Sequence, residues 1–234
     1  AHITLEVNEN DARNRITVCP GANFTLTVEE IAWLKEGIAG YDLVMLQLEL
    51  PMEVVEAVAA WAYEAGVPVM LNPAPAAPLS EALLRHVTYL SPNEHEAAAM
   101  SGQEIDVNGG INMEDVRKAA DYFMRRGVKN LLITFGSNGS VCVNENGVAH
   151  TPCVRVDKVA DTTAAGDSFV AAFCTGFTAG LSERQALVFA SHAAAITVSR
   201  MGAMPSLPAI AEVKALMVER GGHGIDLKVL DVLE

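Results

Sequence analysis

The sequence has 234 residues, of which 50 % are hydrophobic and 19 % are charged, and its net charge is −13. This composition excludes a disordered chain, and the length allows one sizeable core. A charge this negative repels polyanions, so we expect no nucleic-acid partner. The apolar runs are too short to cross a membrane, no signal-peptide pattern opens the chain, and its four cysteines show no metal spacing. These features predict a globular cytoplasmic protein without membrane contact.

Strands and helices alternate through the first half of the chain. Short strands are expected at 3–7 and 16–18, and Thr27 with Glu30 forms a capping box before a helix that ends at Gly37. The next elements, in chain order, are a strand at 41–48, a helix at 51–66, strands at 67–71 and 87–90, helices at 94–100 and 112–127, and a strand at 131–135. The first of these is apolar almost throughout, which is typical of a strand buried on both faces of a parallel sheet.

The rest of the chain begins with a hairpin and then becomes helical. Segments 141–143 and 148–151 flank the turn-rich stretch 144–147, which predicts two antiparallel strands at a sheet edge. Three helices follow, at 166–179, 183–200 and 208–220. Because strands alternate with helices, we expect crossover connections and an α/β fold with a mostly parallel sheet.

The stretch Asp161–Phe169 is the most informative about chemistry. Small residues and a glycine stand where a loop turns into an apolar helix, and such a turn exposes backbone amides at the positive end of the helix dipole. These amides can hold the charge of a transferring phosphoryl group, and Gly166 permits its close approach. Asp167 in the first turn is favoured in its ionised form, as a base that activates a hydroxyl requires. The residues alone leave open that Asp167 only stabilises its helix.

The sequence Asp-Thr-Thr-Ala-Ala-Gly-Asp at 161–167 resembles the second signature of the ribokinase family, also called phosphofructokinase-B-type carbohydrate kinases. Similar segments follow the family order: 47–49, 71–76, 92–96, 132–139 and 190–195. The resemblance implies a Rossmann-like three-layer fold, with a mostly parallel central sheet flanked by helices. It also implies a single kinase domain over 1–234, in which about 1–20 are lid strands and about 24–220 form the α/β core.

The resemblance assigns the reacting groups. Asp167 is implied to be the base and to contact the sugar, while Ala164, Ala165 and Gly166 are implied to line the anion hole. Glu49 is implied to bind a sugar hydroxyl from the end of its strand, where the residues alone would favour a solvated charge.

The resemblance also implies a site for ATP or ADP. Asn93 and Glu96 are expected to help place Mg²⁺ and the phosphates; the alternative is a helix cap followed by an exposed Glu. The remaining nucleotide-binding residues are implied to be Thr134, Phe135, Gly136, Ser137, Asn138, Gly139, Gly166 and His192. An isolated histidine in an Ala-rich helix is more often a core residue, so His192 keeps that alternative.

The resemblance also implies a monovalent cation, expected to be an activating K⁺, beside the anion hole. The matching positions are Asp161, Thr163, Thr197, Arg200, Gly202 and Ser206. Most of them would act through backbone oxygens, so the identity of their side chains carries little weight.

The sequence departs from the family at its start. Members begin with a strand that bears an Asp, followed by a Gly-Gly-Lys-Gly-Ala-Asn motif, and neither is present; 109–112 lacks the Lys and precedes a helix cap. We therefore expect that close to the first third of a typical member is missing. In the full-length protein the lid is expected to form a homodimer.

The motif combination is most similar to members that act on ribose rather than on adenosine or fructose. It implies ATP-dependent phosphorylation of D-ribose at its primary 5-hydroxyl, giving ribose 5-phosphate. The alternatives are another sugar or nucleoside kinase of the family, or a catalytically incomplete nucleotide-binding fragment. A dinucleotide-dependent oxidoreductase would need a Gly-x-Gly-x-x-Gly turn after an early strand, which the sequence lacks.

Overall fold

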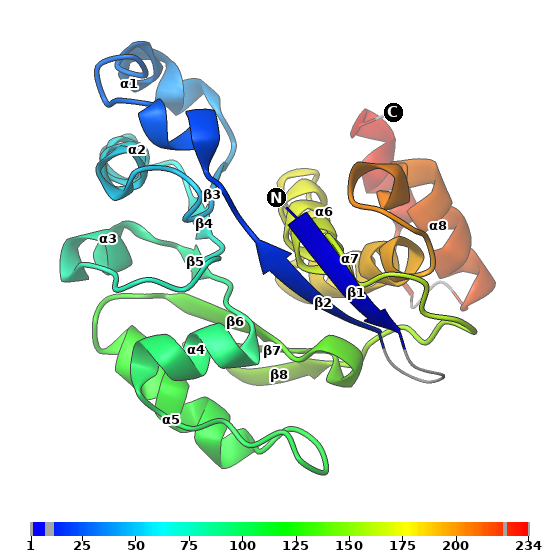
Figure 1. The fold of residues 1–234 in the computed structure, drawn as a ribbon. Helices are drawn as coiled ribbons and strands as arrows, with labels where there is room; N and C mark the ends of the chain where they lie inside the picture. Colours follow the sequence, from blue (N-terminus) through cyan, green and yellow to red (C-terminus); the bar gives the residue numbers. More distant parts are fainter. Residues whose placement is uncertain (1, 8–11, 222–223, 234) are drawn as a thin grey trace. The chain divides into compact units, whose positions relative to one another are not determined.

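The computed structural model describes residues 2–7, 12–221 and 224–233 (Figure 1). The chain divides into two compact units, Pro20–His150 and the combination of Ala1–Cys19 with Thr151–Glu234. A single kinase domain over the whole chain stays a prediction. Among the described helices, none is long and apolar enough to cross a membrane.

A six-stranded sheet forms the centre of the unit Pro20–His150. Its strands follow one another in chain order: β3 (Val44–Leu46), β4 (Val69–Leu71), β5 (Tyr89–Leu90), β6 (Asn130–Thr134), β7 (Ser140–Asn144) and β8 (Gly147–Thr151). Strands β3 to β6 are parallel, with Leu46 opposite Leu71 and Leu90 opposite Leu131. Strand β7 is antiparallel to β6, and β8 is the outermost strand. The mostly parallel sheet and its edge hairpin are thus confirmed.

Helices in the connections supply the core of this unit. They are α1 (Trp33–Gly37), α2 (Met52–Glu64), α3 (Glu81–His86), α4 (Glu94–Ser101) and α5 (Met113–Met124), with short 3₁₀ helices η1 (Gly21–Thr25), η2 (Ile38–Gly40) and η3 (Gly136–Asn138). Val58 of α2 and Phe123 of α5 belong to one continuous buried cluster with Leu71 and Ile133 of the sheet. The apolar faces of the helices therefore pack on the sheet, as the helical periodicity predicts.

Local signals place most helix starts. The side chains of Ser80, Asn93 and Asn112 cap α3, α4 and α5. The predicted capping box is also present, since the Thr27 amide donates to Glu30 at 2.9 Å and the Glu30 amide donates to Thr27 Oγ1 at 3.3 Å. Residues 28–32 form turns, however, and the α-helix proper begins only at Trp33.

The strand expected at 41–48 is much shorter than predicted. Strand β3 has three residues, Tyr41 is 52 % exposed and Met45 within the strand is 39 % exposed. Within the described sheet β3 pairs only with β4, so one edge of β3 carries no neighbouring strand. The expectation of burial on both faces is therefore wrong for Met45.

The second unit combines an N-terminal hairpin with a group of helices. Strands β1 (His2–Val7) and β2 (Ala12–Thr17) pair antiparallel, with Ile3 opposite Ile16 in Cα register. The second strand starts four residues earlier than the predicted 16–18. The helices are α6 (Ala165–Thr178), α7 (Glu183–Val198) and α8 (Ile210–Glu219), with η4 (Met204–Ser206) and η5 (Leu227–Leu233). Assignment of the hairpin to a lid stays a prediction.

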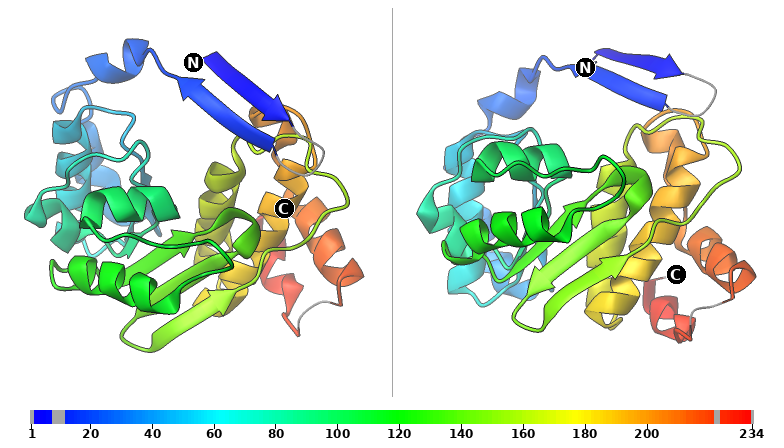
Figure 2. Two further views of the ribbon diagram at one scale, coloured as in Figure 1. Left: turned by 60° about the horizontal axis from the view of Figure 1, so that its bottom comes forward. Right: turned by 90° about the horizontal axis from the view of Figure 1, so that it is seen from below.

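Helices α6 and α7 lie side by side and are joined by a tight turn (Figure 2). The predicted box of Ser182 and Gln185 caps α7. A Cβ atom on Gly176 would lie 3.0 Å from Leu181 Cδ1 and 3.2 Å from Phe189 Cδ1, so a larger residue there would require these side chains to shift. The pairing fixes the first turn of α6 against the end of α7.

Candidate functional site

The loop before α6 enters the helix through a strained residue. Ala164 has φ 61° and ψ 10°, and it is the only non-glycine residue in the described part of the chain with positive φ. For an L-residue this left-handed region costs roughly 1–2 kcal/mol. Backbone strain of this kind persists only where the surroundings enforce it, and it clusters at ligand-binding turns.

The first turn of α6 is open to solvent immediately after Ala164. The Ala165 amide donates to Thr162 O at 3.3 Å and the Ser168 amide donates to Ala164 O at 2.8 Å. No acceptor in the described chain bonds the amides of Gly166 and Asp167, and both residues are exposed. A Cβ on Gly166 would meet no atom within 4 Å, so packing inside the protein does not require glycine there. The turn has the geometry of an anion site at a helix N-terminus.

Asp161 holds this loop in place. Its side chain is 3 % exposed, Oδ1 accepts the Thr163 amide at 2.9 Å, and Oδ2 accepts the Gly202 amide at 3.0 Å. Burial by itself raises the pKa of the carboxyl, but the Thr163 side chain and the Thr163 and Gly202 amides outweigh burial and lower it below the ordinary value. Asp161 is therefore ionised at neutral pH and ties the two loops together.

The end of α7 supports the same turn. The buried Thr197 hydroxyl donates to Ser168 Oγ at 2.8 Å, and Val198 O accepts the amides of Ala160 at 2.8 Å and Asp161 at 3.3 Å. The Arg200 guanidinium is directed to Glu212, which it binds through both terminal nitrogens.

The six positions expected for K⁺ thus lie around one pair of loops. Asp161 links the segment that contains Thr163 to Gly202, and buried Ser206 donates to Ala203 O at 2.6 Å. The Arg200 and Thr197 side chains are used within the protein, so a cation here would depend on backbone oxygens, as K⁺ permits. These loops fit such an ion, with the Asp161 carboxylate as the local negative charge.

The residues predicted to bind the sugar and the nucleotide before residue 150 lie at the carboxyl ends of the parallel strands. Glu49 is exposed three residues after β3, and Asn93 pairs with Thr134 where β5 and β6 end. Asn72, directly after β4, donates from Nδ2 to Ser91 O at 2.6 Å. The carboxyl ends of parallel strands form the usual ligand-binding edge of an α/β sheet.

Asn93 and Glu96 form a complete capping box at the start of α4. The Glu96 amide donates to Asn93 Oδ1 and the Asn93 amide donates to Glu96 Oε2, each at 2.8 Å. Both side chains are oxygen donors of the type Mg²⁺ prefers, but the cap already uses them, so they fit an ion held through water. Within the described residues, no group of three or more His, Cys, Asp or Glu could hold a metal by itself.

The loop after β6 is a tight turn closed by its own hydrogen bonds. The Phe135 amide donates to Gly139 O at 2.8 Å, and the Gly139 amide donates to Gly136 O at 3.1 Å. Gly136 has φ 52° and Gly139 has φ 91°, so the turn itself requires both glycines. Gly136, Ser137 and Asn138 are exposed, which leaves their backbone accessible to a ligand.

His192 lies on α7 with 1 % of its surface exposed, and its Nδ1 is 2.8 Å from Val188 O. This is the environment of a core histidine, the alternative left open by the sequence. Its role beside adenine stays a prediction.

Comparison with known proteins identifies the family. The model of the pfkB family carbohydrate kinases matches residues 2–210. The chain belongs to this family.

Its relatives include ribokinases and deoxyribokinases. The chain is 36 % identical to the ribokinase of Schizosaccharomyces pombe over 212 residues, covering 90 % of this chain and 66 % of that protein. It is 31 % identical to the deoxyribokinase of Salmonella typhi, covering 87 % and 65 %. The structure of Arabidopsis thaliana ribokinase with ribose and ATP matches with a TM-score of 0.79 at 31 % identity, covering 88 % and 66 %. The chain thus spans just under two thirds of these relatives and is shorter at its N-terminus.

The predicted site residues of this pfkB-family chain belong to two different structural units. Glu49, Asn93, Glu96 and the loop 134–139 belong to Pro20–His150, whereas the anion-hole turn, the potassium positions and His192 belong to the other unit. Three features escaped sequence reasoning: the left-handed backbone of Ala164, the Asp161–Gly202 bond and the Asn72–Ser91 bond. Only Asn72 had a local signal, because an Asn-Pro pair follows an apolar strand.

Proposed function

We propose that this carbohydrate kinase transfers the γ-phosphoryl group of ATP to the 5-hydroxyl of D-ribose, giving ribose 5-phosphate and ADP. The observation that carries the proposal is the first turn of α6, where strained Ala164 precedes two open amides and the exposed carboxylate of Asp167. In phosphoryl transfer the protein mainly positions the reactants and stabilises charge on the equatorial oxygens. A helix N-terminus with an adjacent carboxylate supplies both functions.

Each residue then has a distinct task. The Asp167 carboxylate accepts the proton of the attacking hydroxyl, while the amides of Gly166 and Asp167 donate to the phosphoryl oxygens. Glu49 accepts hydrogen bonds from sugar hydroxyls. The turn 136–139 and the edge at Asn93 bind the nucleotide.

Two ions belong to the proposal. Mg²⁺ bound with ATP would neutralise phosphate charge, and Asn93 with Glu96 would hold its water shell. K⁺ would occupy the loops that Asp161 joins and so stabilise the turn at Ala164. We further propose a cytoplasmic homodimer formed through β1 and β2.

Substitution of Asp167 in the complete enzyme tests the assignment. Asp167→Asn should lower kcat at least about a hundredfold, the usual contribution of a general base. Glu183→Gln is the matched control, because Glu183 is also an acidic residue in the first turn of a helix of the same unit. An Asp167→Asn enzyme with more than about a tenth of wild-type turnover contradicts the role of the base.

A coupled assay of ADP release measures this turnover and also tests the sugar and the cation. We expect a higher kcat/KM for ribose than for 2-deoxyribose, and higher rates in K⁺ than in tetramethylammonium. A preference for 2-deoxyribose would transfer the proposal to the activity named for the Salmonella relative. Equal rates with both cations would contradict the potassium site.

A further inference from the structure

The turn 136–139 is held by a side chain that lies outside it. His150 of the outermost strand β8 has its Nε2 atom 2.9 Å from the backbone oxygen of Asn138, 12 positions earlier in the chain. A carbonyl oxygen only accepts hydrogen bonds, so in this contact Nε2 carries the proton and donates. His150 and Asn138 are both exposed, so the contact is no part of the buried core.

This hydrogen bond fixes one peptide group at both of its ends. The peptide between Asn138 and Gly139 contains the carbonyl that accepts from His150 and the Gly139 amide, which donates to Gly136 O at 3.1 Å. In a trans peptide the C=O and N–H point in opposite directions. Gly139 has φ 91° and ψ −140°, a conformation that glycine adopts readily, so no side chain of its own restricts the rotation of this peptide group.

The other orientation of this peptide group would open the turn. Rotation by half a turn would bring Asn138 O toward Gly136 O, and the bond that closes the turn would be lost. The His150 donor would then face an N–H group instead of a carbonyl. His150 therefore favours the closed turn, in which Gly136 and Asn138 present their backbone to solvent. The Gly136 amide has no acceptor among the described residues, so it is available to a ligand.

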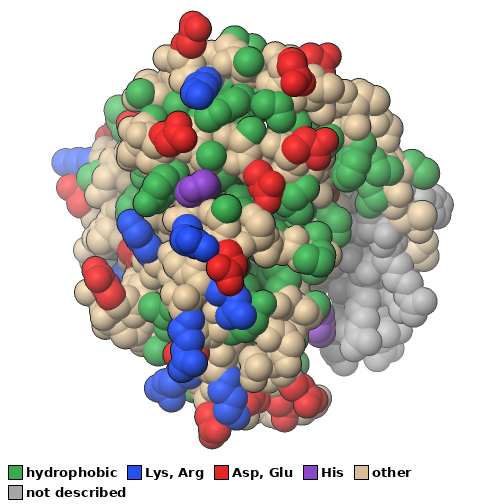
Figure 3. Space-filling model, turned by 90° about the vertical axis from the view of Figure 1, so that its left-hand side faces the viewer, with side chains coloured by type: hydrophobic (Ala, Val, Ile, Leu, Met, Phe, Trp, Pro, Cys, Tyr) green, Lys and Arg blue, Asp and Glu red, His purple; other side chains and the backbone are tan. Residues whose placement is uncertain are grey.

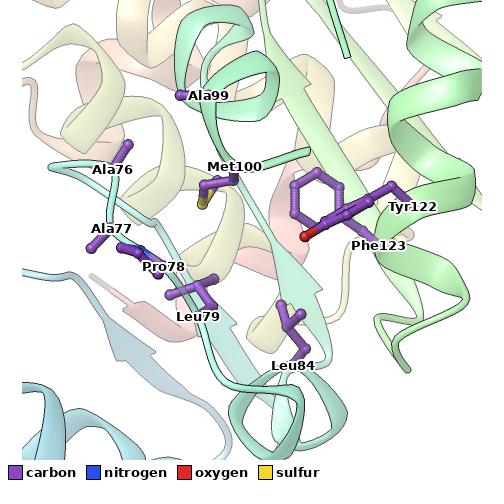
Figure 4. A pocket seen from close by; sticks show the side chains of 9 residues that line it. All are labelled: Ala76, Ala77, Pro78, Leu79, Leu84, Ala99, Met100, Tyr122 and Phe123. Carbon is purple, nitrogen blue, oxygen red and sulfur yellow. The ribbon is translucent and has the colours of Figure 1, made fainter. Parts of the chain in front are cut away.

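Two other features of the unit Pro20–His150 fit a nucleotide less well. A hollow of about 250 Å³ lies between the segment 76–79 and helices α3, α4 and α5, and none of the nine labelled side chains that line it carries a charge (Figure 4). Figure 3 shows Lys and Arg side chains gathered on one part of the molecular surface. Three basic side chains of this unit are already paired with carboxylates: Arg85 with Glu81 at 3.0 Å, Lys118 with Glu114 at 3.0 Å and Arg125 with Asp121 at 3.8 Å.

We propose that His150 is a positioning residue for the nucleotide, which acts by holding Asn138 O and so keeps the turn 136–139 in its closed conformation. This inference rests on the proposed function, which assigns the turn to ATP or ADP. His150 itself does not have to touch the ligand. A ligand that binds only the closed turn loses apparent affinity in proportion to the fraction of molecules in which the turn is open.

Three variants of the 234-residue chain test this role. His150→Ala removes the donor, and His150→Gln replaces it with an amide NH₂ group that can reach the same place. Val148→Ala is the matched control, because Val148 is also exposed and lies two residues earlier, on the same face of β8. Titration calorimetry measures ADP affinity, and NMR hydrogen exchange of the Gly139 amide measures how often the turn opens.

His150→Ala should weaken ADP binding about threefold, since an exposed hydrogen bond contributes at the low end of the usual range. Exchange of the Gly139 amide should become faster by a similar factor. His150→Gln should restore most of both quantities, and Val148→Ala should change neither. A packing role of the ring would not be rescued by Gln, so rescue separates the hydrogen bond from a structural effect.

The possible failures are distinguishable. Normal ADP binding with unchanged Gly139 exchange in His150→Ala would overturn the role of His150 and leave the proposed function standing. Equal effects of His150→Ala and His150→Gln would overturn the role of the hydrogen bond. A wild-type chain that binds no ADP would overturn the assignment of the turn to the nucleotide, and the role of His150 with it.

Discussion

The buried carboxylate of Asp161 gives the sharpest test of how the α6 turn is held. Asp161→Asn keeps the shape of the side chain but replaces one acceptor oxygen by an NH₂ group. One of the amides of Thr163 and Gly202 then faces a donor instead of an acceptor. A buried donor left without an acceptor costs about 1–3 kcal/mol. We expect a loss of about 2 kcal/mol, which for a chain of this size lowers the Tm by roughly 4–8 °C.

The loss should depend on pH in a defined direction. Because the pKa of folded Asp161 is below its ordinary value of 3.8, the ionised carboxylate stabilises the fold fully above that value. This stabilisation disappears as the pH falls from about 3.8 toward the lower pKa of the folded state. The Tm difference between wild type and Asp161→Asn should therefore be constant from pH 7 to pH 5 and smaller at pH 3.

Thermal unfolding followed by circular dichroism at these pH values measures the effect. Asp157→Asn is the control, because Asp157 lies in the same loop but is exposed. If Asp161→Asn unfolds within 1 °C of Asp157→Asn at pH 7, the carboxylate does not hold the loop. An undiminished Tm difference at pH 3 would show that the effect of the mutation comes from something other than the charge.

Two further predictions concern the backbone. Ala164→Gly should raise the Tm. It removes roughly 1–2 kcal/mol of left-handed strain from the folded state, whereas the greater conformational entropy of the unfolded chain with glycine costs only about 0.4–1 kcal/mol. A Tm below that of Ala164→Val would contradict the left-handed conformation of Ala164. Gly127→Ala should lower the Tm more than Gly66→Ala, since both glycines have positive φ but only at Gly127 would the new Cβ meet Arg85, at 2.6 Å. Equal shifts of the two variants in the same melting experiment would argue against that close approach.

Sequence reasoning succeeded where one local interaction decides the structure. The side-chain caps of Asn93, Asn112 and Ser182 start helices where predicted, because each depends on residues within one turn. The motif at 161–167 was placed correctly at a loop-to-helix turn for the same reason. Alternation of apolar strands and amphipathic helices was sufficient for the parallel sheet.

Features that depend on distant partners were not accessible in this way. Helix α3 has six residues, too few for helical periodicity to show. In the described sheet β3 has one neighbouring strand, which the apolar run 41–48 does not reveal. The sequence of Asn93 and Glu96 is compatible both with ion binding and with a cap, and the structure shows that the cap is formed. The loop that contains Ala164 is held by a bond between residues 41 positions apart, from the Gly202 amide to Asp161.

One of the two units is discontinuous in sequence, so its two segments are synthesised at different times. Pro20–His150 is continuous in sequence, so a ribosome completes it before any residue of α6 is made. Residues 1–19 precede it in the chain, yet the rest of their unit follows it. The turn at Ala164 needs Thr197 and Gly202 for its supporting hydrogen bonds. At 5–20 residues per second, residues 151–206 take roughly 3–11 s to synthesise. Throughout that interval the anion-binding turn lacks the residues that support it and cannot form.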